Sequence, residues 1–261
     1  MSPARPAVVV VTGASGAIGA ALARRYAGPG RCLALQGRNL DRLEAVAQAC
    51  RAQGAQVHVC ALDVREAVVL REWLLAFDSQ HPVDLIIANA GVANVLVDLS
   101  DWETSTAIDE VIDTNLYGVV NTVLPIAERM RQRRAGHVAI VSSLAAFRGM
   151  AISPAYCASK AALRAWGQSL RPLLSENGVS LTMIYPGFVK SAMSDEFPAN
   201  KPFLIEPDQA AMRIHHGLQA KRATIVFPAS LGLGIKLLNL LPDRWADAVL
   251  SFLGLAPKGR R

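Results

Sequence analysis

Tyr156 and Lys160 are the two residues of this chain whose types and spacing most directly indicate chemistry. They lie four positions apart, just after Pro154, which is well placed at the start of a helix. This spacing puts both side chains on one helical face. There the lysine ammonium should lower the pKa of the phenol, which would make the phenol a proton donor and acceptor near neutral pH. The same spacing also occurs on ordinary solvated helices. Whether Tyr156 and Lys160 are catalytic therefore depends on the motifs in the rest of the chain.

A glycine-rich turn near the N-terminus indicates a phosphate-binding site. An apolar run at Ala7–Val11 leads into Gly13, Gly16 and Gly19, and a helical pattern follows. In such a turn the first glycine permits a sharp bend, the second lets backbone approach a pyrophosphate, and the third lets helix and strand pack closely. The helix N-terminus then offers unpaired N–H groups to the phosphates. We therefore predict a dinucleotide cofactor at this turn.

The residue that follows the second apolar run favours NADP(H) over NAD(H). An NAD site usually has an acidic side chain at this place, which holds the ribose hydroxyls. This chain has Arg38 there and no acid in the preceding stretch. A guanidinium can pair with a 2′-phosphate through two hydrogen bonds. The alternative is a solvent-facing arginine at the start of the next helix.

Along the chain, short apolar runs alternate with longer stretches of helical spacing. This pattern is typical of a parallel sheet covered on both faces. We expect strands at Ala7–Val11, Arg31–Leu35, Gln56–Ala61, Val83–Ala88, His137–Val141, Ser180–Ile184 and Ala223–Phe227. We expect helices at Ala17–Tyr26, Leu40–Gln53, Glu66–Phe77, Trp102–Arg133 and Tyr156–Leu174. The predicted fold class is α/β, a Rossmann-type doubly wound sheet of seven mostly parallel strands with helices on both faces. With no repeat or linker, residues 1–261 form a single domain that ends in an apolar helical segment at 229–257.

Composition and charge exclude several classes of protein. The net charge is +6, but the basic runs at 129–134 and 258–261 lack interleaved aromatic residues, so we expect no nucleic-acid partner. The four cysteines form no CxxC pair and have no histidine at metal-ligand spacing, so we expect no metal and no disulfide framework. They fit a reducing compartment, and we expect a cytoplasmic protein. The chain shows neither a signal peptide nor an apolar stretch long enough to span a bilayer.

Taken together, these residues resemble those of the short-chain dehydrogenases/reductases in their compact single-domain form. The matching positions are the glycine turn at Thr12–Gly19, Asp63 with Val64, Asn89 to Gly91, Asn115, Ser142 with Ser143, Tyr156 with Lys160, and Pro186 with Gly187. Ser143 precedes Tyr156 by 13 positions, as in the family, which selects it over Ser142. The match extends over most of the chain.

The resemblance implies four catalytic residues. Tyr156 would be the general acid in carbonyl reduction and the general base in alcohol oxidation. Lys160 would lower the pKa of Tyr156 and hold the nicotinamide ribose. Ser143 would hydrogen-bond the substrate oxygen and stabilise its developing charge. Asn115 would hold a water that links Lys160 to a proton path.

The glycine turn, Arg38 and the resemblance together imply a set of cofactor-binding residues. These are Gly13, Ser15, Gly16, Ala17, Ile18, Gly19, Arg38, Asp63, Val64, Asn89, Ala90, Gly91, Tyr156, Lys160, Pro186, Gly187, Val189 and Ser191. Asp63 and Val64 would meet the adenine, and Val189 the nicotinamide carboxamide. Each position also has an ordinary structural interpretation, such as a turn or a helix cap.

The chain departs from the commonest pattern of the family at two positions. The second glycine of the compact members stands directly before Ile18, where this chain has Ala17, and the glycine lies instead at Gly16. A methyl group at position 17 could crowd the pyrophosphate and weaken cofactor affinity. The glycine spacing is similar to that of the extended members, which include sugar epimerases and dehydratases, but this chain lacks room for their larger C-terminal domain. Ser191 replaces a common threonine and keeps the hydroxyl.

The substrate is expected to lie between two loops, at Leu144–Ser153 and Lys190–Pro207. Their apolar residues suggest a hydrophobic or bulky carbonyl compound or alcohol, or else loop packing that meets no ligand. These residues are Phe147, Met150, Met193, Phe197, Phe203 and Leu204.

The apolar C-terminal segment has three possible roles. It could cover the substrate pocket, form a homodimer or homotetramer interface, or lie on a membrane surface with the tail of Lys258, Arg260 and Arg261 near lipid headgroups. The function we expect is that of an NADP(H)-dependent oxidoreductase acting on a carbonyl or secondary alcohol. The alternative is a catalytically idle NADP(H)-binding protein used for regulation or assembly.

Overall fold

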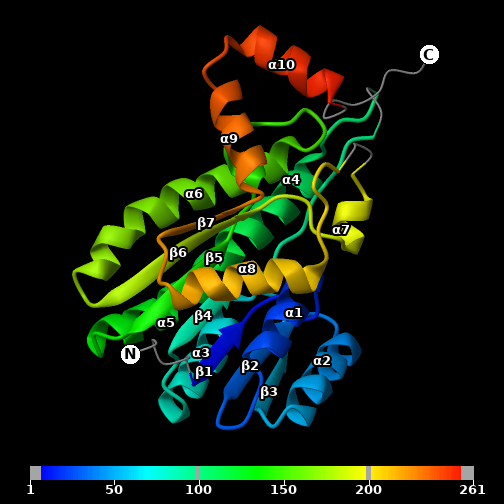
Figure 1. Cartoon of the computed structure of the whole chain (residues 1–261). Helices are drawn as coiled ribbons and strands as arrows, with labels where there is room; N and C mark the ends of the chain where they lie inside the picture. The colour runs from blue at the N-terminus through cyan, green and yellow to red at the C-terminus, as the bar shows by residue number, and fades with distance from the viewer. Residues whose placement is uncertain (1–6, 98–99, 198–200, 254–261) are drawn as a thin grey trace.

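A seven-stranded sheet forms the centre of the computed structural model, which describes residues 7–97, 100–197 and 201–253. Every strand pair is parallel, and the spatial order is β3-β2-β1-β4-β5-β6-β7 (Figure 1). The strands are β1 (Val8–Val11), β2 (Cys32–Gly37), β3 (Gln56–Ala61), β4 (Leu85–Ala88), β5 (Gly136–Val141), β6 (Val179–Pro186) and β7 (Thr224–Phe227). The strand order reverses between β1 and β4, which is the switch point where doubly wound sheets bind ligands. The predicted fold class is therefore confirmed.

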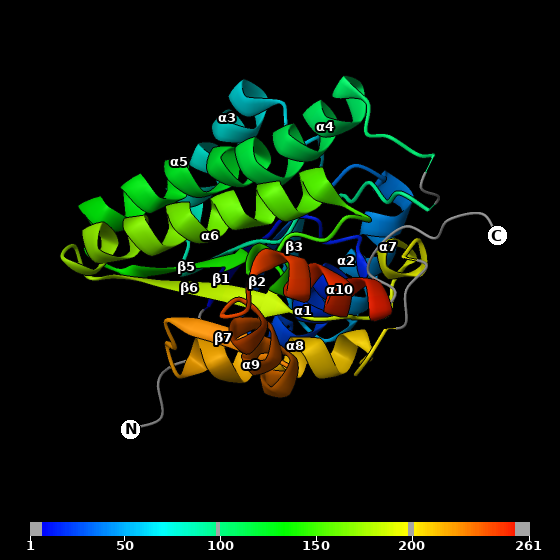
Figure 2. The ribbon, with the colours of Figure 1, turned by 90° about the horizontal axis from the view of Figure 1, so that it is seen from above.

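Helices cover both faces of the sheet, as the apolar character of the strands requires. Val9 and Val10 alternate between the two faces and are both fully buried, because each face carries its own core. On one face lie α1 (Ala17–Tyr26), α2 (Leu40–Ala52) and α8 (Pro207–Gln219). On the other lie α3 (Ala67–Gln80), α4 (Ser105–Ile112), α5 (Gly118–Gln132) and α6 (Pro154–Ser175) (Figure 2).

The long helix predicted at Trp102–Arg133 differs from the structure in two ways. Trp102 precedes the helix, because Thr104 caps α4 by accepting a hydrogen bond from the Ala107 N–H (3.2 Å). The Trp102 side chain is 89% exposed. Five residues between α4 and α5, Asp113–Tyr117, form a π-helical turn, η1. Such turns within a longer helix often occur at functional sites. This one contains Asn115.

The C-terminal segment forms two short helices, α9 (Ala229–Leu238) and α10 (Asp243–Phe252), and Pro242 is the residue before the second helix. They stand beyond the carboxyl ends of the strands (Figure 1). In the part of the chain that the structure describes, no helix combines the length and apolarity needed to cross a bilayer. The basic tail residues Lys258, Arg260 and Arg261 lie outside the described residues.

Candidate active site

A cavity of about 1480 Å³ opens at the carboxyl ends of the strands. It exceeds the range of about 300–1000 Å³ usual for a drug-sized ligand, so it has room for a larger one. The sequence-predicted residues that line it are Gly13, Ser15, Gly16, Ala17, Ile18, Arg38, Asp63, Val64, Asn89, Ala90, Gly91, Ser143, Tyr156, Lys160, Pro186, Gly187, Val189 and Ser191. Gly19 and Asn115 are outside this lining, and each lies directly behind it.

The three glycines of the turn meet different surroundings. Gly13 has a φ of +62°, and a β-carbon there would lie 2.8 Å from the Ala90 Cα. A β-carbon at Gly19 would lie only 2.2 Å from the Gly13 carbonyl oxygen. At Gly16 the nearest atom would be that same oxygen, at 3.3 Å, and no other atom lies within 4 Å. The first and third glycines therefore permit internal packing, whereas the second leaves space on the cavity side.

Thr12 and Asn89 brace the turn from the ends of β1 and β4. The Thr12 hydroxyl oxygen accepts hydrogen bonds from the N–H groups of Asn89 (3.1 Å) and Ala90 (3.3 Å). The Asn89 amide donates in return to the carbonyl oxygens of Thr12 (3.1 Å) and Gly13 (3.2 Å). These four bonds fix the glycine turn against the neighbouring strand.

The turn fits the pyrophosphate of a dinucleotide. Helix α1 begins at Ala17 without a side-chain cap, and its first two residues, Ala17 and Ile18, line the cavity. Its first N–H groups and the positive end of its dipole are therefore available to an anion. The open side of Gly16 gives a phosphate access to this backbone.

Two arginines flank the end of the cavity beyond β2. Arg38 is half exposed, and its Nη1 lies 3.9 Å from Asp63 Oδ2. Arg42 lies in the first turn of α2 and donates from Nη2 to the Ser15 carbonyl oxygen (3.2 Å). The sequence analysis missed Arg42, because Arg38 precedes the helix and no helical spacing relates the two arginines. Asp63 is already held by Arg65, whose Nη2 lies 2.8 Å from the carboxylate.

Tyr156 and Ser143 form a hydrogen-bonded pair in the cavity. Burial raises the pKa of the Tyr156 phenol, and the hydrogen bond from Ser143 opposes that shift. The Ser143 oxygen also accepts a bond from the Ala145 N–H (3.1 Å), which fixes its position at the end of β5. A hydroxyl and a protonated phenol thus face the same space, an arrangement that can hold and protonate an oxygen atom.

Lys160 lies beneath Tyr156 and is only 4% exposed. Its Nζ donates to the Val141 carbonyl oxygen (3.3 Å) and lies 5.7 Å from the centroid of the Tyr156 ring. Burial lowers the pKa of Lys160 to about 8. The pKa of Tyr156 is thus raised where the sequence predicts a lowered value, because desolvation of the phenol is the largest cause of its shift. The effect of Lys160 on this pKa stays a prediction.

Asn115 is fully buried behind Gly91 and uses its side chain on protein groups. Its Oδ1 accepts from the Val92 N–H (2.8 Å), and its Nδ2 donates to the Val92 carbonyl oxygen (2.9 Å) and the Ser159 hydroxyl oxygen (3.0 Å). A β-carbon at Gly91 would lie 3.1 Å from Asn115 Oδ1 and 3.4 Å from Lys160 Nζ. Asn115 thus joins the loop after β4 to the helix that carries Lys160.

Glu103 is a further residue of this region that the sequence analysis missed. Its two carboxylate oxygens each lie 3.1 Å from the Ala155 N–H, in the first turn of α6. A carboxylate at a helix N-terminus stabilises the helix through its unpaired N–H groups. Glu103 therefore anchors the start of the helix on which Tyr156 lies, from 52 positions away in the sequence.

The apolar helices α9 and α10 line the outer part of the cavity. They contribute Leu231, Ile235, Leu238, Val249, Leu250, Phe252 and Leu253, and the two loops contribute Met150, Met193 and Phe197 to the same cavity. Arg148 joins α10 to the loop after β5, with its Nη1 3.0 Å from Asp243 and its Nη2 2.7 Å from Asp247. Of the roles considered for this segment, its inner side is placed for covering the pocket.

Comparison with known proteins agrees with this geometry. The model of the short chain dehydrogenase family matches residues 7–202. A protein of Myxococcus xanthus described as an uncharacterized oxidoreductase is 37% identical over 243 residues, which cover 92% of this chain and 94% of that protein. The NADP-dependent 3-hydroxy acid dehydrogenase of Salmonella typhi is 31% identical over 188 residues, which cover 70% of this chain and 72% of that protein.

Solved structures with the same fold hold either of the two nicotinamide cofactors. An alcohol dehydrogenase from Thermococcus sibiricus complexed with 5-hydroxy-NADP has a TM-score of 0.73 and 28% identity, covering 84% of this chain and 93% of that one. A short chain dehydrogenase from Mycobacterium paratuberculosis bound to NAD has a TM-score of 0.72 and 22% identity, covering 83% of this chain and 94% of that one.

Proposed function

The chain belongs to the short-chain dehydrogenase family, and we propose that it uses NADP(H) to interconvert a carbonyl and a secondary alcohol on a hydrophobic or bulky small molecule. The observation that carries the proposal is the hydrogen-bonded pair of Tyr156 and Ser143 in the cavity that also contains the glycine turn. An idle cofactor-binding protein, the alternative from the sequence, would need no such pair, and no observation favours it.

The residues that we propose to hold the cofactor are among those that line the cavity. The backbone of Gly16, Ala17 and Ile18 would bind the pyrophosphate. Asp63 and Val64 would border the adenine, Asn89 to Gly91 the middle of the cofactor, and Pro186, Gly187, Val189 and Ser191 the nicotinamide end. When bound, the nicotinamide supplies or accepts the hydride of the reaction.

Arg38 supports the choice of NADP(H). Its guanidinium is exposed at the cavity end beyond β2, and Arg42 brings a second positive charge to the same end. Two cations there favour a 2′-phosphate over a free hydroxyl. The Salmonella relative and the Thermococcus structure are named for NADP, and both exceed 25% identity to this chain.

We propose that Tyr156 exchanges the proton of the reaction. In reduction the phenol donates its proton to the carbonyl oxygen as that oxygen becomes an alkoxide, and in oxidation the phenolate removes the proton from the alcohol. The Ser143 hydroxyl donates to the same oxygen and stabilises its charge. Because burial raises the pKa of Tyr156, the phenol is in the protonated form needed for reduction at neutral pH.

Lys160 and Asn115 are proposed to support this proton transfer from behind. Lys160 would bind the nicotinamide ribose through its Nζ, which Val141 already orients. The sequence analysis gave Asn115 the task of holding a water. Its side chain also bonds Val92 and Ser159, so we propose that Asn115 positions those two groups around Lys160 in addition to holding the water.

The substrate class follows from the walls of the outer cavity. Side chains of α9, α10 and the two loops make these walls predominantly apolar, and Arg148 is paired with two carboxylates. A hydrophobic carbonyl compound or alcohol fits such walls better than a charged one, because a charge would lose its hydration without gaining a partner. The same argument applies to either direction of the reaction.

The outer surface of α9 and α10 supports the proposal of a homodimer or homotetramer. It exposes large apolar side chains that do not line the cavity, including Leu237 (57%), Leu240 (80%) and Trp245 (59%), which a second copy of the chain could cover. Peripheral contact with a membrane is the alternative occupant of this surface. The four free cysteines support a reducing, cytoplasmic setting.

A substrate screen tests the proposed function. Purified protein is offered carbonyl compounds and secondary alcohols of increasing apolar bulk, each with NADP(H) and with NAD(H), and the nicotinamide absorbance is followed. We expect turnover with NADP(H) that improves with apolar bulk. Cofactor binding without turnover of any compound would support the idle alternative, and faster turnover with NAD(H) would contradict the cofactor assignment.

A further inference from the structure

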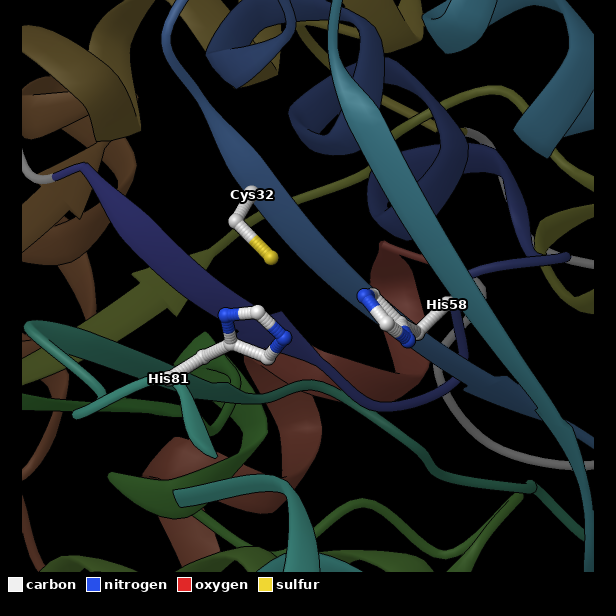
Figure 3. Close-up of side chains that lie close together, drawn as sticks. All are labelled: Cys32, His58 and His81. Atoms are coloured by element: carbon white, nitrogen blue, oxygen red, sulfur yellow. The ribbon is translucent and has the colours of Figure 1, made fainter. Parts of the chain in front are cut away.

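Cys32, His58 and His81 lie together at the edge of the sheet opposite the cavity. One ligand atom from each residue, a sulfur and two imidazole nitrogens, lies within 4.8 Å of the other two. Figure 3 shows the thiol and the two rings gathered around a common space. No step proposed for the reaction uses any of these residues.

The topology explains how residues far apart in sequence converge here. Cys32 opens β2 and is aligned with Gln56 of β3, so His58 lies on the same face of the sheet, two residues along. Helix α3 runs back toward the amino ends of the strands, and His81 follows it as the C-cap residue. The His81 N–H donates to the Phe77 carbonyl oxygen (2.8 Å), which fixes this residue beside β3.

The rings are arranged compatibly with a shared ion. The centroids of His58 and His81 are 5.0 Å apart, and two imidazoles on one tetrahedral zinc ion have centroids roughly 5 Å apart when Zn–N is about 2.0–2.1 Å. Phe77 packs against both rings, at 5.3 Å and 5.2 Å, and limits their rotation. Ligand atoms of a tetrahedral site are roughly 3.3–3.8 Å apart, so closing the site requires side-chain shifts of about 1 Å.

Gln56 lies beside His58 and can serve as its outer partner. The Gln56 amide nitrogen Nε2 lies 3.0 Å from His58 Nε2, so His58 Nε2 accepts the hydrogen bond in this arrangement. A 180° turn of the amide brings its oxygen to the same place, where it accepts the His58 Nε2 proton and leaves the Nδ1 lone pair for a metal. The Cys32 side chain is only 8% exposed, whereas His58 and His81 are partly exposed. A metal ion can therefore reach the cluster from the surface on the side of the histidines.

We propose that Cys32, His58 and His81 form a binding site for a borderline-soft divalent metal ion, Zn²⁺ in the first instance. One thiolate and two neutral imidazoles are ligands that Zn²⁺ prefers, and a water completes the tetrahedron. On binding, the Cys32 thiol releases its proton to solvent and the sulfur bonds to the metal. The ion would join β2, β3 and the end of α3, away from the catalytic cavity.

The spacing of these residues explains why the sequence predicted no metal. The ligands are 26 and 23 positions apart, without the paired spacing of a zinc motif. Only the strand register and the return of α3 bring them together, and neither is visible in a local pattern.

Cobalt provides the direct test, because Co²⁺ occupies zinc sites and reports its ligands through absorption. Untagged, reduced full-length protein is titrated with Co²⁺ and then with Zn²⁺. We expect one equivalent of Co²⁺ to produce visible bands of a tetrahedral ion and a near-ultraviolet thiolate band, and Zn²⁺ to remove both. Cys32→Ser should abolish the thiolate band, and His58→Gln and His81→Gln should each weaken binding at least tenfold.

Cys60→Ser is the matched control, since Cys60 lies on β3 with His58 but is not part of the cluster. This variant should keep the thiolate band at full intensity. Thermal unfolding and NADPH binding confirm that each variant is folded, because the site and the cavity lie at opposite ends of the strands. Absence of the thiolate band in the wild-type protein, or its persistence in Cys32→Ser, would overturn the proposal.

Discussion

The Lys160 ammonium nitrogen lies 5.7 Å from the centroid of the Tyr156 ring and donates its hydrogen bond to the Val141 carbonyl oxygen, 3.3 Å away. The lysine therefore approaches the face of the tyrosine ring and is tied to the end of β5. The phenol takes its hydrogen bond from Ser143. Both ionisable groups are buried, so desolvation raises the pKa of the Tyr156 phenol and lowers the pKa of Lys160 to about 8.

Lys160→Met should stabilise the protein at neutral pH. Burial lowers the pKa of Lys160 from 10.5 to about 8, so between these pH values the unfolded chain binds more protons than the folded one. Burying the charged Lys160 therefore lowers the free energy of unfolding by an amount on the order of 3 kcal/mol below pH 8. This loss of stability disappears as pH rises toward 10.5. Urea unfolding at pH 7 and pH 10, with exposed Lys236→Met as the control, should show a gain that shrinks with pH. An equal gain at both pH values would contradict this.

Gly16→Ala and Gly19→Ala should separate cofactor binding from folding. The added methyl group at position 19 would lie 2.2 Å from the Gly13 carbonyl oxygen, so we expect a loss of more than about 2 kcal/mol in the free energy of unfolding. At position 16 the methyl group meets only that oxygen, at 3.3 Å, and enters the phosphate side of the turn. Gly16→Ala should keep its thermal midpoint and weaken NADPH binding at least tenfold. Unchanged NADPH affinity in this variant would argue against a pyrophosphate at the turn.

Arg38→Leu should weaken NADPH binding and leave NADH binding unchanged. A hydrogen bond to a charged group contributes about 1.5–3 kcal/mol, which corresponds to roughly a 10- to 100-fold change in Kd. Calorimetric titration with both cofactors measures the difference, and Arg42→Leu should show a smaller effect in the same direction. Arg71→Leu on the exposed face of α3 is the control. Equal weakening of both cofactors would mean that Arg38 does not distinguish them.

Arg148→Met should loosen α10 from the cavity. Its ion pairs with Asp243 and Asp247 involve largely exposed carboxylates, so we expect little change in the thermal midpoint. Limited proteolysis within α9 and α10 should become faster, and KM for bulky apolar substrates should rise severalfold while the NADPH Kd stays the same. Arg131→Met, which removes an ion pair on α5, is the control. Unchanged proteolysis and KM would show that the ion pairs do not hold α10 in place.

The fold could be predicted from the sequence because its signals are local. The valine run at Val8–Val11, the glycines that follow it and the helical spacing after Ala17 each specify their element, and α1 has the predicted bounds. Most of the sequence-predicted residues that line the cavity were named from the resemblance to the short-chain dehydrogenases/reductases, whose motifs are also local in sequence. The roles assigned to these residues remain predictions.

Other features depend on contacts between distant segments and left no local pattern. Glu103 caps a helix that begins at Pro154, and the π-helical turn that holds Asn115 interrupts a stretch with continuous helical spacing. The pKa of Tyr156 was predicted in the wrong direction, because the spacing to Lys160 reveals proximity but not the burial of both groups. Arg42 required the path of α2 over the turn at Ser15 to be known.

The central claim is that Tyr156 transfers the proton of the reaction, and Tyr156→Phe tests it most directly. Turnover of the best carbonyl substrate and the NADPH Kd are measured side by side, with exposed Tyr117→Phe as the control. We predict that kcat of Tyr156→Phe falls about 100- to 10,000-fold while its NADPH Kd and thermal midpoint stay those of the wild-type protein. A variant that binds NADPH normally and retains more than a tenth of the wild-type kcat would contradict the claim.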